Sequence, residues 1–78
     1  MDEKKKKDRG KPALLDVVAL LSDLPAEHVS RGQVGTVVER LDAQTLLVEF
    51  NDAQGRAYAI VACPEADLLV LHYVPEAA

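Results

Sequence analysis

The sequence predicts a small all-β domain of five short strands. Apolar and polar residues alternate with a period of two in several short stretches, as they do in strands with one buried face. β-Branched residues are concentrated in these stretches, and glycine, proline and other turn-forming residues separate them. With 78 residues the chain allows one domain.

The first eleven residues differ in charge from the rest of the chain. Residues 1–11 hold six basic and three acidic side chains, a net charge of +3, whereas residues 12–78 hold three arginines and ten acidic residues, a net charge of −7. A segment with no apolar residue after Met1 cannot bury enough surface to offset the entropy of ordering it. We therefore expect residues 1–11 to be a disordered basic tail and residues 12–78 to be the folded domain.

The first element follows Pro12. Val17 and Val18 favour a strand, but the apolar residues between Leu14 and Leu21 also fit a helical spacing of i, i+3, i+4 and i+7. We favour the strand and keep the helix as the alternative. Pro25 ends either element, and the residues after it are typical of a single helical turn.

A hairpin occupies the centre of the chain. Thr36–Leu41 is rich in β-branched residues, and Asp42–Gln44 supplies a turn. In Thr45–Phe50, Leu46, Val48 and Phe50 fall on one face and Thr45, Leu47 and Glu49 on the other. Phe50 is the sole phenylalanine and is predicted to lie at the centre of the core.

Two glycines precede the hairpin and two strands follow it. Gly32 and Gly35 indicate a positive φ or a close approach between backbones. Arg56–Cys63 alternates as a strand, and its alanines predict a face approached closely by another layer. After a short turn at Pro64–Asp67, Leu68–Tyr73 is predicted to form the last strand, apolar on both faces and therefore internal or at an interface.

Four segments together resemble a known family. They are residues 15–25, 31–39 (RGQVGTVVE), 48–55 (VEFNDAQG) and 68–71. In this order they resemble a small bacterial family catalogued as a domain of unknown function (the 4926 family), over nearly everything after Pro12. The resemblance implies a five-stranded SH3-like barrel with a flexible charged N-terminal tail, and it implies no activity or catalytic residue.

Two looser resemblances rest on the hairpin alone. It is similar to the KOW element of ribosomal and transcription-elongation proteins, which contacts RNA or protein. It is also similar to the SH3-like part of the nitrile hydratase β subunit, which packs on a partner subunit. The acidic body departs from the KOW pattern, because binding to a phosphate backbone requires clustered lysine and arginine.

Side chains that carry chemistry are few. Cys63 and His72 form the one conceivable nucleophile–base pair, with His72 expected one strand away from Cys63. A buried thiol and a surface histidine explain both residues more simply, and His28 falls in a loop. We therefore expect no enzyme, no cofactor, no metal site and no small-molecule substrate. The sequence has no apolar run of membrane-spanning length and no signal peptide, which predicts a cytoplasmic protein.

Two binding roles remain. The first is a protein-interaction module or accessory partner subunit, which includes regulating or neutralising the product of a neighbouring gene, with a protein partner or a second copy held by exposed apolar residues. The candidates for this role are Leu47, Leu69, Leu71 and Tyr73. The alternative is a KOW-like nucleic-acid-binding module that uses Lys4, Lys5, Lys6, Lys7, Arg31, Arg40 and Arg56.

Overall fold

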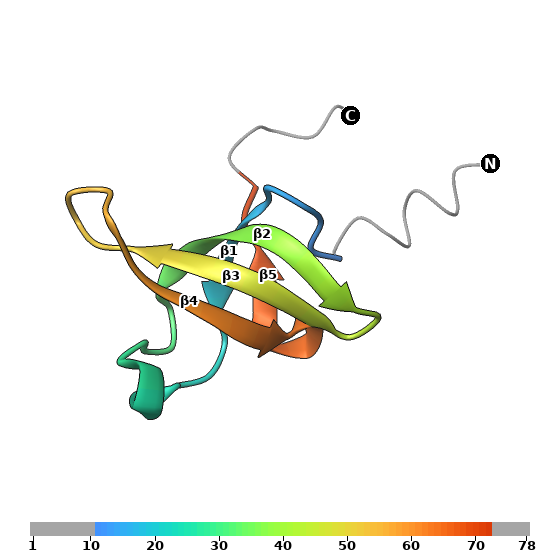
Figure 1. Cartoon of the computed structure of the whole chain (residues 1–78), viewed down its shortest axis with the longest axis horizontal. Coiled ribbons are helices and arrows are strands. Elements are labelled where there is room, and N and C mark those ends of the chain that lie inside the picture. Colours follow the sequence, from blue (N-terminus) through green and yellow to red (C-terminus); the bar gives the residue numbers. More distant parts are fainter. Residues whose placement is uncertain (1–10, 73–78) are drawn as a thin grey trace.

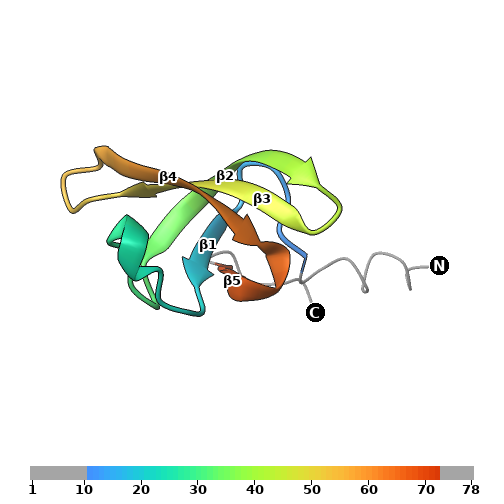
Figure 2. The same ribbon diagram turned by 60° about the horizontal axis from the view of Figure 1, so that its bottom comes forward.

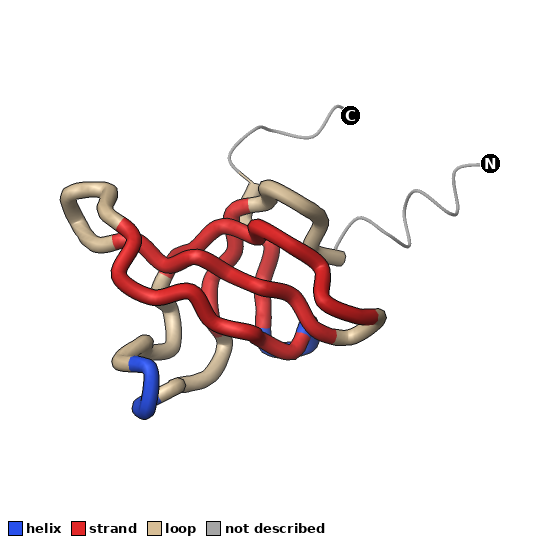
Figure 3. The backbone as a smooth tube through the Cα atoms, in the orientation of Figure 1, coloured by secondary structure: helices blue, strands red, loops and turns tan. Residues whose placement is uncertain are grey.

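The computed structural model describes residues 11–72, and within them the fold is all-β, as predicted. The five strands are β1 (Val17–Leu20), β2 (Val34–Asp42), β3 (Thr45–Asn51), β4 (Ala57–Pro64) and β5 (Leu68–Val70) (Figures 1 and 3). Two single 3₁₀ turns, η1 (Pro25–Glu27) and η2 (Glu65–Asp67), interrupt the connections. The predicted basic tail falls almost wholly outside the described residues, which begin with the exposed Lys11.

The five strands form one antiparallel sheet in the order β4-β3-β2-β1-β5. The sheet folds over on itself, so that β4, β3 and β2 form one layer and β1 and β5 lie in the other (Figure 2). β2 belongs to both layers, since it pairs with β3 on one side and with β1 on the other. This is the five-stranded SH3-like barrel that the sequence predicted.

Gly35 lies where β2 passes between the two layers. It is opposite Phe50 of β3 and opposite Val18 of β1. A Cβ atom added here would lie 2.8 Å from the carbonyl oxygen of Glu49 and 2.8 Å from the Phe50 ring. The predicted close approach therefore applies to Gly35, whereas Gly32 has the positive φ, at 91°.

The core lies between the two layers. Its apolar members come from all five strands and from the loop between β1 and β2, and they are Val18, Leu20, Val29, Val37, Leu46, Val48, Phe50, Val61, Cys63 and Leu68. Phe50 is fully buried and is the largest of the fully buried side chains, which confirms its predicted place. No helix in the described part of the chain has the length and hydropathy needed to cross a membrane.

The structure settles the first strand, which the sequence left open between strand and helix, and corrects the end of the last strand. Residues 17–20 form a strand and not the alternative helix, and the turn before them places Leu15 at a φ of 71°. The last strand is shorter than predicted, because β1 begins at Val17 and offers no earlier partner. The backbone N–H of Leu71 makes the final bond of this pair, to the Val17 carbonyl at 2.9 Å. Tyr73 lies outside the described residues.

Candidate protein-docking surface

The outward surface of β3 and β4 carries a cluster of apolar side chains. Ile60 is 57% exposed and Tyr58 is 44% exposed, because they alternate along β4 with residues that face the core. Leu47 of β3 is half-buried and lies directly opposite the exposed Ala62. We name Leu47, Tyr58, Ile60 and Ala62 the outer apolar patch.

Acidic residues border this patch. Glu49 lies opposite Ile60 in the β3–β4 register, and Glu39 of β2 lies opposite Leu47. Both are on the outward side of the sheet, where Glu39 is exposed and Glu49 is half-buried. The surface thus combines an apolar centre with a charged border, the arrangement typical of protein interfaces.

One side of β4 has no neighbouring strand within residues 11–72 (Figure 1). The N–H of Glu65 donates to the Gln44 carbonyl at 2.8 Å, and antiparallel residues alternate between pairs that exchange such bonds and pairs that do not. By this alternation Ala59, Val61 and Cys63 direct their backbone groups at β3. Ile60 and Ala62 direct theirs away from β3, along what we call the open edge, and the register shift between Phe50 and Asn51 ends this alternation before Tyr58.

The predicted partner-binding residues do not form one surface. Leu47 is on β3, whereas Leu69 is on β5, three places further along the sheet. Leu69 is 51% exposed and lies in a cross-strand row with Ala19 and Val34. Leu71 follows β5 and is half-buried. The described candidates therefore lie on different strands of the sheet, while Tyr73 lies beyond the residues that the structure describes.

The arginines proposed for nucleic acid are separated as well. Arg40 lies near the β2–β3 turn, where its guanidinium contacts a Glu65 carboxylate oxygen at 2.8 Å and donates to the Pro12 and Asp42 carbonyls. Arg56 is exposed at the opposite end of β3, in the β3–β4 loop. Arg31 is exposed before β2. Lys4, Lys5, Lys6 and Lys7 fall outside the described residues.

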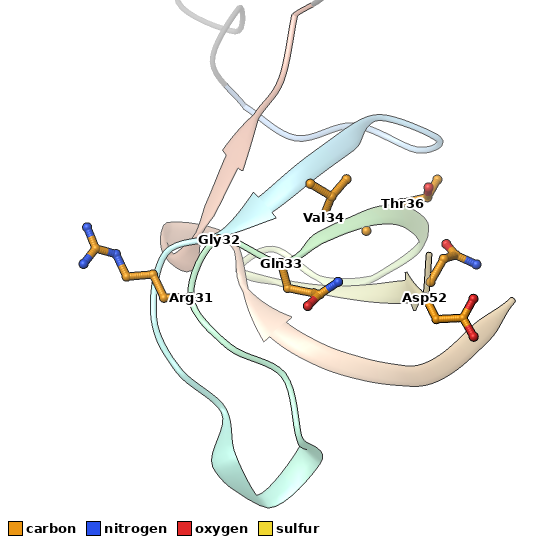
Figure 4. A pocket seen from close by; sticks show the side chains of 8 residues that line it. Arg31, Gly32, Gln33, Val34, Thr36 and Asp52 are labelled. Atoms are coloured by element: carbon orange, nitrogen blue, oxygen red, sulfur yellow. The ribbon is translucent and has the colours of Figure 1, made fainter. Parts of the chain in front are cut away.

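An open groove of about 530 Å³ lies beside the start of β2. Gln33, Thr36 and Asp52 line it, together with backbone at Gly32 and Gly35. Figure 4 shows the Arg31 side chain pointing away from these polar groups. A second groove, of about 500 Å³, runs along Pro12, Gln44 and Glu65. No histidine or cysteine is among the residues that line either groove.

Cys63 and His72 are not arranged as a reactive pair. Cys63 is fully buried and its Sγ lies 3.7 Å from the Val61 carbonyl. Burial raises the pKa of the Cys63 thiol, and the negative charge of Asp67 raises it further. His72 is exposed and follows β5, which does not pair with β4, so the expectation of neighbouring strands is wrong. Within residues 11–72 no three potential ligands cluster as a metal site.

The sequence reasoning missed Tyr58 and Ile60 as surface residues. They alternate with Ala59 and Val61 in the sequence, but the alanines of this stretch predict a face covered by another layer. In the structure Ala57 and Ala62 are exposed, and only Ala59 packs against the core. The missing information was which of the two faces of β4 points inward, since both faces are apolar.

Comparison with protein families gives one match. The model of the family described as a domain of unknown function (DUF4926) matches residues 14–70, which span every strand of the barrel. No curated protein matches the chain, and no solved structure matches it.

Proposed function

The chain belongs to the DUF4926 family, and from this premise we propose that it is a protein-interaction module that binds a partner protein through the outer apolar patch. One observation carries the proposal. Tyr58 and Ile60 hold large apolar side chains in solvent on a rigid strand, next to Leu47. A domain this small has few apolar residues to spare, so their exposure as a group favours a binding role.

The chemistry of the patch also indicates the kind of partner. Tyrosine is enriched in the centres of protein interfaces, where its ring adds contact area with little loss of side-chain entropy. Glu39 and Glu49 border the apolar residues. A complementary partner would present apolar side chains flanked by lysine or arginine, because opposite charges at the border favour association and exclude acidic surfaces.

Nucleic-acid binding has less support among the described residues. Arg40 is already paired with Glu65, and Arg56 lies at the other end of β3 from it. The separated arginines do not form the continuous basic stripe that follows a phosphate backbone. A catalytic role has less support still, because the thiol of Cys63 is buried.

Site-specific photocrosslinking in cells tests this role. A benzoylphenylalanine replaces Tyr58 in one full-length variant and Leu69 in a control variant of similar exposure on β5. We expect an adduct with a second, different protein from position 58 and none from position 69. Adding Leu47→Lys should abolish the adduct, since it removes the apolar centre of the patch while its charge is accommodated by Glu39. The same adduct from both positions, or none from position 58, would contradict the proposal.

A further inference from the structure

The open edge of β4 is built differently from the other strands of the barrel. The strand has eight residues, AYAIVACP, and none of them is charged. Natural proteins protect exposed edges with charged side chains, prolines within the strand, or very short strands. In β4 the one proline is the last residue, and the strand is long. An edge of this kind can accept another strand through its backbone groups.

We propose that the open edge pairs with the same edge of a second copy of this chain, giving a two-fold symmetric dimer with β4 antiparallel to β4 of the other copy. The arrangement of the outward backbone groups supports a copy as the occupant. Ile60 and Ala62 point their N–H and C=O groups outward by the alternation described above, and this set is symmetric about Val61.

That symmetry fixes the register of the pair. When Val61 lies opposite Val61 of the other copy, Ile60 of each copy lies opposite Ala62 of the other. Every outward group of these two residues then meets a complementary group, and about four backbone hydrogen bonds form across the two-fold axis. Residues opposite one another also point to the same side of the sheet, so the exposed faces of both strands remain on one side.

The charges next to β4 favour the same arrangement. Arg56 directly precedes the strand and Glu65 directly follows it. In an antiparallel pair the beginning of one strand lies beside the end of the other, which brings Arg56 of each copy near Glu65 of the other. Elsewhere the acidic bodies repel each other, since residues 12–78 carry a net charge of −7. The uncharged strand is the place where this repulsion is least.

The dimer goes beyond the proposed partner-binding role and does not depend on it. Edge pairing uses backbone groups in the plane of the sheet and leaves the outer apolar patch accessible. It joins the two patches into one surface across the axis. The interface is small, and we therefore expect a dissociation constant of about 1–100 μM, as is typical of weak, transient contacts.

A charge exchange at Ile60 tests both the edge and the register. Sedimentation equilibrium of the purified full chain should show a reversible monomer–dimer equilibrium. Ile60→Lys and Ile60→Glu should each weaken dimerisation by at least tenfold, because they place two like charges at neighbouring diagonal positions across the axis. An equimolar mixture of the two variants should recover a heterodimer. Leu69→Lys, on the other edge strand, should dimerise as the unmodified chain does.

Circular dichroism of each variant establishes that it remains folded, as expected for an exposed position. A wild-type chain that is monomeric at 500 μM would overturn the proposal. Loss of the dimer in Leu69→Lys but not in Ile60→Lys would do the same. Failure of the mixed variants to associate would overturn the register centred on Val61. A monomeric chain that still gives the Tyr58 adduct in cells would refute the dimer alone, and a dimer without that adduct would refute the partner role alone.

Discussion

The two outermost strands of the sheet, β4 and β5, differ in the means that keep them from pairing with other chains. β5 has three residues and ends where β1 runs out of partners, so few backbone groups extend along its outer side. β4 has eight residues, an uncharged sequence and two large exposed apolar side chains. β5 is protected from pairing with other chains by its short length alone, whereas β4 is neither short nor charged.

Leu69 on β5 is as exposed as Tyr58 on β4, so exposure of an apolar side chain does not by itself identify a binding strand. The distinguishing feature is the combination of an exposed apolar face with a long row of outward backbone groups. That combination occurs on β4, and it is the reason why we propose two separate surfaces for association on this strand, its face and its edge.

The largest effect is expected from a substitution in the core that supports both strands. Phe50→Ala deletes the largest fully buried side chain and should lower the free energy of unfolding by about 3–5 kcal/mol. A loss of this size leaves a small domain mostly unfolded. Urea denaturation measures it, with the exposed Tyr58→Ala as the control. A loss below about 1 kcal/mol would show that Phe50 does not hold the two layers together.

Gly35 tests the connection between the half of the sheet that ends in β4 and the half that ends in β5. Gly35→Ala places a methyl group 2.8 Å from a backbone oxygen, so the strands must shift, at a cost of about 1–3 kcal/mol. Gly32→Ala is the matched control, because its Cβ meets open space and the cost of about 1 kcal/mol comes from the positive φ alone. Thermal unfolding should rank Gly35→Ala as the less stable variant, and the reverse order would contradict the close approach.

Cys63 reports on the inner face of the edge strand. Its buried thiol should react with a disulfide reagent much more slowly in the native protein than in urea. Its raised pKa means that the thiol ionises first in the unfolded chain, so the free energy of unfolding should fall as the pH rises through about 8.5 and above. Cys63→Ala should lack this part of the pH dependence. Native labelling as fast as in urea would show that β4 does not stay closed.

The smallest effect concerns the ion pair next to β4. Arg40→Ala breaks the contact with Glu65, but the arginine side chain is 42% exposed, and solvent screens such a pair. We expect a loss of less than about 1 kcal/mol in urea denaturation. Glu65→Gln serves as the paired variant. A loss of several kcal/mol in Arg40→Ala would mean that its contacts with the Pro12 and Asp42 carbonyls fix the end of the barrel.

Much of the fold could be predicted from sequence because local patterns determine it. The alternation in Thr45–Phe50 identified the buried face of β3, and turn-forming residues located the hairpin. The end of β5 could not be predicted, because it depends on where β1 begins. The residues of the outer apolar patch could not be predicted either, since Leu47 and Leu69 are both apolar strand residues and only the strand order separates them. Ile60 and Val61 look alike in sequence, and packing alone decides which of them faces the core.

The most direct measurement is amide hydrogen exchange, residue by residue, at two protein concentrations. At a protein concentration well below the dissociation constant of the dimer, the N–H groups of Ile60 and Ala62 should exchange rapidly, while those of Val61 and Cys63, which bond to β3, should be protected. At 1 mM the amides of Ile60 and Ala62 should become protected, and the amide of Val70, which points away from β1 along the edge of β5, should not change. Rapid exchange at Ile60 and Ala62 at both concentrations would contradict pairing through the open edge of β4.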